Sequence, residues 1–155
     1  MIISTIGLSL FNTMPIYAWN TQAPSSSVII FVSFSMPKES LRGWIKEAEK
    51  IKAPLVIRGL VNNSFADTTK TVMGILPDNH GGVQLDPTLF KRFHIEKVPA
   101  VVVIDPVCLS KEGCNEYDVV YGDVPLSYAL TKIMQQEDQL SPYAKVALRK
   151  LNESV

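Results

Sequence analysis

The hydrophobic and polar positions of the chain follow two periods, which predict strands and helices in turn. β-branched and aromatic residues dominate 28–34, and a second strand is predicted over 55–60, which begins with the apolar run Leu55-Val56-Ile57. Between them, apolar residues recur at helical spacing and predict an amphipathic helix: Leu41, Trp44, Ile45, Ala48 and Ile51. Strand, helix and strand in this order predict a right-handed crossover between two parallel strands.

The middle of the chain carries weaker patterns that predict shorter elements. A helical stripe begins at Ser64, with Asp67 three residues on as a capping partner, and ends before Pro77. Apolar residues at the two ends of 83–85 predict a short edge strand. Asp86-Pro87 then opens a short helix, because proline is well tolerated in a first helical turn. These elements form a helical insertion ahead of the next strand.

A continuous apolar run over 101–104 predicts a short, fully buried strand. Pro99 heads this run at a position that tolerates a missing backbone donor, and we expect the Val98-Pro99 bond to be cis. A short connection leads from this strand to 117–121, which predicts an antiparallel partner strand.

Two apolar helical faces, over 126–134 and 142–151, end the pattern. The order of elements predicts an α/β fold with a central mixed sheet, helices on both faces, a helical insertion before the cis-proline strand and an extra C-terminal helix. A helix, a Val-Pro step and a buried strand form the second half of a thioredoxin-like fold. We therefore predict a thioredoxin-like domain over 28–136 and a C-terminal helical extension over 137–155.

The first residues carry an export pattern. Positions 1–18 are mostly apolar, lack acidic residues and end in Pro15-Ile16-Tyr17-Ala18, which favours a cleaved secretory signal ahead of a polar linker over 19–27. The segment contains no Lys or Arg, so a buried N-terminal helix or strand stays open as the alternative. Export implies that the mature domain works in an oxidising compartment.

The composition narrows the function classes. With 155 residues, of which 46% are hydrophobic, the chain can bury one ordinary core. Lys and Arg number 15 and Asp and Glu number 15, so no basic field points to nucleic acid and no polybasic patch points to a membrane surface. No apolar run approaches the roughly 18 residues of a spanning helix, so we expect no stable membrane span after signal cleavage.

Cys108 and Cys114 are the only cysteines, and an isolated close pair in a secreted chain most often forms a structural disulfide. The alternative is a redox-active pair in an exported thiol-disulfide oxidoreductase or isomerase, although Lys111 is the lone cation beside it. His80 and His94 do not complete a recognisable ligand spacing with the cysteines, so we expect no metal and no cofactor.

The turn between the first strand and the first helix is where redox members of the thioredoxin-like fold carry a Cys-x-x-Cys pair. This chain has Ser35-Met36-Pro37-Lys38 there, so Ser35 is predicted to cap the helix and no catalytic residue is expected. Arg58-Gly59 lie at the end of the second predicted strand and Asn62-Asn63 follow it, in the region where ligands dock in open α/β sheets. The asparagines serve equally well as left-handed turn residues, with Arg58 paired to a nearby carboxylate.

Several segments resemble the TrbC family of F-type conjugative transfer systems, whose members are pilus (pilin) assembly proteins of a type IV secretion machinery. The resemblance extends over about Val28 to Ile133 and is carried by five blocks: Phe34-Ser35-Met36-Pro37 with Ser40-Leu41, Leu55 to Phe65, Asp86 to Phe90, Val98 to Val103, and Tyr117 to Asp123. It implies a periplasmic thioredoxin-like domain that supports pilus assembly and associates with another assembly factor, TraW.

The hypothesis that follows is a periplasmic, non-enzymatic binding module of a conjugative pilus assembly machine. A groove of the thioredoxin kind without its thiols suits an extended partner segment that is held by backbone pairing. The candidate partner-binding residues lie near the ends of the predicted strands: Ser35, Met36, Pro37, Arg58, Gly59, Asn62, Asn63, Val98 and Pro99.

Overall fold

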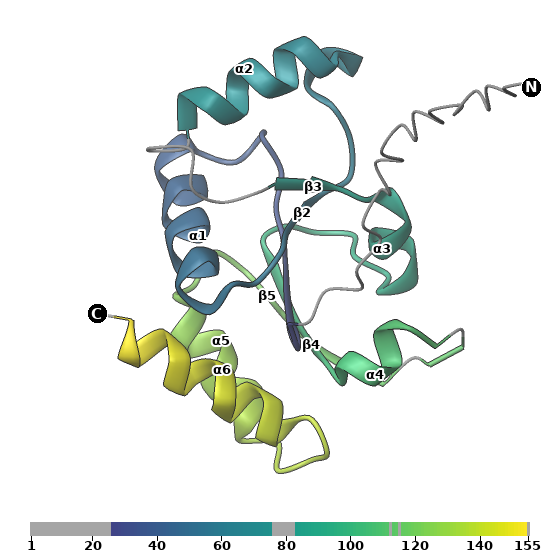
Figure 1. Ribbon diagram of the computed structural model, residues 1–155, viewed down its shortest axis with the longest axis vertical. Helices are drawn as coiled ribbons and strands as arrows, with labels where there is room; N and C mark the ends of the chain where they lie inside the picture. The colour runs from purple at the N-terminus through teal and green to yellow at the C-terminus, as the bar shows by residue number, and fades with distance from the viewer. Residues whose placement is uncertain (1–25, 76–82, 112, 115, 155) are drawn as a thin grey trace, which may run out of the picture.

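The computed structural model describes residues 26–75, 83–111, 113–114 and 116–154. Within these ranges the chain forms one mixed sheet flanked by helices (Figure 1). The strands are β1 (Val28–Phe31), β2 (Leu55–Ile57), β3 (Val83–Leu85), β4 (Ala100–Ile104) and β5 (Tyr117–Tyr121). The helices are α1 (Lys38–Ile51), α2 (Phe65–Ile75), α3 (Pro87–Arg92), α4 (Pro106–Leu109), α5 (Leu126–Met134) and α6 (Ser141–Glu153), with a 3₁₀ turn, η1 (Val61–Asn63).

The strands lie in the order β3-β2-β1-β4-β5. β1, β2 and β3 run parallel, with Ile30 opposite Leu55 in the first pair, and β4 runs antiparallel to both β1 and β5. β1 and β4 are buried along their whole length because helices cover both faces of the sheet, which explains their continuous apolar sequences. The predicted parallel crossover, edge strand and antiparallel final pair are confirmed.

Alternate residues of the central strands point into two cores, one on each face of the sheet. Ile30 and Val101 belong to the larger core, to which α1, α5 and α6 contribute. Phe31 and Val102 belong to the smaller core with Phe90 of α3, whose ring meets Phe31 edge-on at a centroid distance of 4.9 Å. Figure 1 shows α1, α5 and α6 on one side of the sheet and α3 and α4 on the other, so the prediction of helices on both faces is confirmed.

The first helix begins later than the sequence suggests. α1 starts at Lys38 with Pro37 at its N-cap position and has no side-chain cap, so the predicted Ser35 cap is wrong. Ser33 and Ser35 lie in a turn in which the Met36 amide donates to the Ser33 carbonyl at 3.1 Å. The Ser35 hydroxyl lies 2.9 Å from the Ser33 hydroxyl, two residues before the position from which a side chain caps a helix.

Two later helix starts agree with the sequence. Ser64 Oγ accepts a hydrogen bond from the Asp67 amide at 3.2 Å at the start of α2. Asp86 Oδ1 accepts from two amides of the first turn of α3, at 2.9 and 3.1 Å. The cysteine connection contains a short additional helix, α4, which the sequence pattern did not predict, and Asp105 caps it.

The C-terminal helix α6 packs against α5 and α1 and contributes to the larger core. Ala144, Ala147 and Leu151 are the buried residues on its inner face. The predicted extra C-terminal helix is therefore present, and it shares a core with the sheet.

Two expectations fall on residues that the structure does not describe: the signal over 1–18 and most of the linker over 19–27. Among the helices of the described ranges, none is long and apolar enough to cross a bilayer.

Candidate functional site

A groove opens where β1 and β2 end and the chain turns into its next elements. It has a volume of about 420 Å³ and is bounded by the residues after β1, the residues after β2, α3 and the loop before β4. We name it the strand-end groove, and its lining residues are Val32, Ser33, Phe34, Ser35, Ile57, Arg58, Gly59, Leu60, Val61, Phe90, Glu96 and Val98. The carboxyl ends of parallel strands are where open α/β sheets bind ligands.

Part of the predicted binding set lines this groove, and part lies beside it. The predicted residues in the lining are Ser35, Arg58, Gly59 and Val98. The predicted residues outside the lining are Met36, Pro37, Asn62, Asn63 and Pro99. Phe90 and Glu96 line the groove although the sequence pattern did not single them out, because they belong to the insertion and to the loop that follows it.

Arg58 follows β2 and is held in place within the groove lining. Its Nη2 atom donates to the Ile95 carbonyl, and its guanidinium carbon lies 4.9 Å from the centre of the Phe90 ring. A backbone carbonyl thus replaces the expected carboxylate partner, and no ion pair of Arg58 occurs within the described ranges. The residue is exposed, so its other N–H groups are accessible to a bound group.

Asn62 and Asn63 shape the chain beside the groove. Both adopt left-handed backbone conformations, with φ angles of 50° and 56°, which asparagine tolerates better than most residues. Both are exposed, and Asn62 Nδ2 donates to Asp67 Oδ2 at 3.3 Å. Their predicted role as turn residues is confirmed.

The Val98-Pro99 bond is cis, as predicted. Val98 is half-buried and lines the groove, whereas Pro99 is buried and its carbonyl accepts the Gly122 amide at 3.0 Å. The start of β4 therefore lies beside the end of β1, and Val98 shares the groove with Ser35 of the turn after β1.

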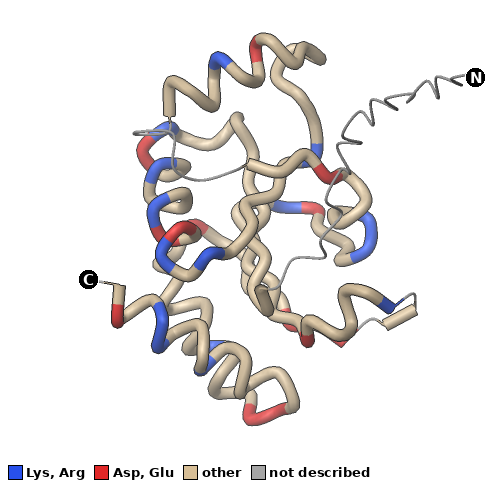
Figure 2. The backbone as a smooth tube through the Cα atoms, viewed as in Figure 1, with Lys and Arg blue, Asp and Glu red and all other residues tan. Residues whose placement is uncertain are grey.

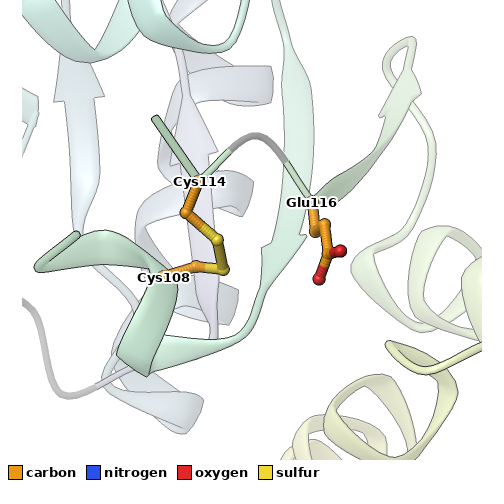
Figure 3. A group of neighbouring side chains, drawn as sticks. All are labelled: Cys108, Cys114 and Glu116. Atoms are coloured by element: carbon orange, nitrogen blue, oxygen red, sulfur yellow. A yellow bond between two sulfur atoms is a disulfide. The ribbon is translucent and has the colours of Figure 1, made fainter. Parts of the chain in front are cut away.

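Cys108 and Cys114 form the predicted disulfide, with Cα atoms 5.3 Å apart, and Arg92 donates to the Cys108 carbonyl at 2.5 Å. Figure 3 shows the bridge with Glu116 beside it, and the sulfur and carboxylate atoms lie within 4.8 Å of one another. Sulfur atoms that are bonded to each other are not thiolate ligands, so this group does not bind a metal while the bridge is intact. The bridge follows β4, at the opposite end of that strand from the strand-end groove.

A pair of carboxyl groups lies outside the groove, where Asp118 of β5 meets Asp138 before α6. Asp138 Oδ1 accepts the Leu140 and Ser141 amides at 2.8 and 3.1 Å, and the Leu140 amide is the main cause of a lowered Asp138 pKa. Burial, then the hydrogen bond and charge of Asp138, raises the Asp118 pKa to about 6. Asp138 is therefore the first of the two carboxyl groups to ionise, and Asp118 holds its proton below about pH 6.

A relative with a known compartment matches most of the chain. The chain is 35% identical over 117 residues to the periplasmic protein TrbC of Escherichia coli (strain K12). The matched region is 74% of this chain and 51% of that protein, so the chain spans about half the length of this relative. No solved structure matches the chain.

A family match covers the site. Residues 30–133 match the family described as the type-F conjugative transfer system pilin assembly protein. This range includes the whole lining of the strand-end groove and both cysteines. The chain therefore belongs to the TrbC family of type-F conjugative transfer system pilin assembly proteins.

Proposed function

We propose that the chain is a periplasmic, non-catalytic assembly factor of an F-type conjugative pilus, and that it binds other assembly proteins through the strand-end groove. Family membership supports the assembly role, and the name of the Escherichia coli relative supports the compartment. The observation that carries the binding role is Arg58, a cation held in an open groove without an ion-pair partner among the described residues.

The domain is proposed to be thioredoxin-like. Three features support this fold: the parallel crossover from β1 through α1 to β2, the antiparallel pair of β4 and β5, and the cis Val98-Pro99 bond before β4. In redox members of that fold, the proline faces a thiol-bearing turn. Here the turn is Ser35-Met36-Pro37-Lys38, so the groove keeps a binding surface without thiol exchange.

The groove suits an extended segment of a partner protein. Apolar residues such as Phe34 and Leu60 share the lining with two charged residues, Arg58 and Glu96. An extended segment can form backbone hydrogen bonds beside the strand ends and place alternate side chains in the groove. A carboxylate on that segment can accept from the remaining N–H groups of Arg58. We propose a TraW-like assembly protein as the source of the segment.

The test is the affinity of the purified chain for a purified TraW-like protein, measured by isothermal titration calorimetry. Arg58→Gln removes the cation, and we expect binding to weaken about tenfold to a hundredfold because a charge-assisted hydrogen bond contributes about 1.5–3 kcal/mol. Arg42→Gln is the matched control, since Arg42 is an exposed arginine on α1 that pairs with Glu39 at 2.6 Å. Unchanged affinity in Arg58→Gln, or an equal loss in both variants, contradicts the proposal.

The alternative function, a periplasmic thiol-disulfide oxidoreductase or isomerase, gains no support from these findings. Cys108 is 6% exposed, and neither cysteine lines the strand-end groove. Neither the family match nor the Escherichia coli relative describes such an activity.

A further inference from the structure

A second groove lies at the opposite end of β1 from the strand-end groove. Its volume is about 530 Å³, and it is formed by the segment entering β1, the end of α1 and one side of α6. We name it the lysine groove, after its principal lining residues: Lys50, Ile51, Lys52, Val146, Ala147 and Lys150. The two grooves share no lining residue, so a partner in one leaves the other open.

Positive charge borders this groove on two sides. Lys50 and Lys52 lie at the end of α1 and Lys150 lies on α6, and Figure 2 shows basic segments in both places. Glu153 is the one acidic residue in the lining, and its Oε1 lies 3.6 Å from Arg149 Nε. None of the three lysines forms an ion pair within the described part of the chain. The lining therefore carries more positive than negative charge.

An apolar surface lies between the lysines. Ile51 and Ala147 are each 4% exposed and Val146 is 42% exposed. An exposed valine beside buried apolar residues offers a contact for one inserted apolar side chain. A hollow of this kind receives side chains from a partner protein, whereas binding to a lipid surface needs a flat or protruding contact.

We propose that the lysine groove binds an acidic segment of a partner protein, in which one apolar side chain is flanked by carboxylates. The apolar side chain contacts Val146, and the carboxylates pair with Lys50, Lys52 and Lys150. Together with the strand-end groove, this makes the chain an adaptor with a binding surface at each end of β1. The binding of the acidic segment does not depend on occupation of the strand-end groove.

The N-terminal segment of this chain does not have the chemistry of that occupant. Residues 1–25 lead into the groove lining at Ser26 and Ser27, and they contain no Asp or Glu. A segment without carboxylates does not neutralise three lysines. Charge complementarity therefore points to an acidic segment of another protein.

The test uses a synthetic peptide in which one leucine is flanked on each side by two glutamates, titrated into the full chain at low salt. NMR chemical shifts of the backbone amides locate the site and give the dissociation constant. We expect the largest shifts around the lysine groove, at Lys50, Lys52, Val146 and Lys150. Replacing the glutamates with glutamine is expected to abolish binding, and replacing the leucine with serine is expected to weaken it about fivefold.

Two charge variants of the protein complete the test. The first variant removes the charge of the three groove lysines: Lys50→Gln, Lys52→Asn and Lys150→Gln. Asparagine replaces Lys52 because this residue has a left-handed φ angle of 55°, which asparagine tolerates. We expect this variant to bind the peptide about tenfold more weakly. The second removes the same charge from exposed positions outside the groove and is expected to bind the peptide like the unmodified chain: Lys38→Gln, Lys70→Gln and Lys91→Gln.

Several results would overturn the proposal. The proposal is contradicted if the two charge variants weaken peptide binding equally. It is also contradicted if the chain binds the glutamine peptide as tightly as the glutamate peptide, or if the chemical shift changes are centred outside the lysine groove. The chain could instead fail to bind the peptide but bind phosphatidylglycerol vesicles, and lose that binding in the first charge variant. This result would assign the lysines to a lipid surface.

Discussion

The strand-end groove and the lysine groove lie at opposite ends of β1 and present positive charge in different ways. Arg58 is the one cation in the strand-end lining, and the Ile95 carbonyl and the Phe90 ring hold its guanidinium. The lysine groove has three ammonium groups on long side chains, none of which has an ion-pair partner within the described ranges. A fixed planar guanidinium favours a partner group of defined geometry, whereas mobile ammonium groups select mainly for negative charge.

Phe90 and Val146, one lining residue from each groove, differ in how deeply they are buried. Phe90 lines the strand-end groove, is 4% exposed and packs edge-on against Phe31 of β1. Val146 lines the lysine groove and is 42% exposed. A change at the first position therefore alters binding and stability together, while a change at the second alters binding alone.

The largest effect is expected from Phe90→Ala. The substitution leaves a cavity in the smaller core and removes the ring beneath Arg58, so we expect a loss of about 3–4 kcal/mol in the free energy of unfolding. Val146→Ala is the matched change in the lysine groove and should cost about 0.5 kcal/mol or less. Urea unfolding monitored by circular dichroism measures both values. Similar losses in the two variants would contradict the difference in burial between Phe90 and Val146.

The disulfide should separate stability from binding. Because the bridge closes a short loop, we expect the double variant Cys108→Ser, Cys114→Ser to lose about 2 kcal/mol in the free energy of unfolding. Its affinity for the TraW-like partner should not change, since neither cysteine lines the strand-end groove. Calorimetric titration and an insulin reduction assay check this. If the unmodified chain reduces insulin and the double variant does not, the result would instead favour the oxidoreductase function.

Salt should affect the grooves unequally. At an ionic strength of about 1 M the Debye length falls to about 3 Å, which screens exposed charges strongly. We expect binding of the acidic peptide at the lysine groove to weaken about tenfold, and binding of the TraW-like partner to weaken about threefold, because apolar contacts and backbone hydrogen bonds contribute there. Parallel titrations at low and high salt measure the two ratios. Equal ratios would remove the distinction between fixed and mobile cations.

The smallest expected effect is a pH dependence of stability that arises at the start of α6. This helix lines the lysine groove and does not line the strand-end groove. The fold raises the Asp118 pKa from 3.8 to about 6, so the folded state holds this proton more tightly than the unfolded state does. The resulting stabilisation is complete below pH 3.8 and is lost as the pH rises through about 6. The lowered Asp138 pKa acts in the opposite direction, below pH 3.8 and outside this window.

Asp118→Asn should therefore flatten the pH dependence of stability between about pH 4 and pH 7. We expect a change of about 1 kcal/mol in that difference, because water screens the half-buried carboxyl group. Urea unfolding at the two pH values gives the number, and Glu49→Gln, at an exposed position of α1, serves as the control. A slope that is the same in Asp118→Asn and in the unmodified chain would contradict the assignment.

The order of the elements was predictable because it depends on local periodicity. Local sequence alone indicates which residues are buried in the apolar run over 101–104 and in the helical pattern from Leu41 to Ile51. The Ser35 cap was wrong because a cap depends on the residue at which the helix begins, and Pro37 sets that position here. The short helix α4 was missed because its only signal is Asp105 before a proline.

The site was predictable only in part because its contacts join distant segments. The positions of Arg58 and Val98 next to strand ends placed them in the groove. The carbonyl that holds Arg58 belongs to Ile95, 37 residues further along the chain, and local patterns do not report such pairs. The lysine groove was missed for the same reason, since Lys50 and Lys150 read separately as solvated helix surfaces.

Photo-crosslinking in cells that assemble F-type pili tests the central claim most directly. A photoreactive amino acid in place of Val98 should crosslink to a TraW-like assembly protein, and Arg58→Gln in the same chain should strongly reduce the yield of that product. The same amino acid in place of Val107, which is 55% exposed on α4 and lies outside the strand-end groove, should give no such product. Equal crosslinking from both positions, or an unchanged yield at Val98 in Arg58→Gln, would contradict binding through the strand-end groove.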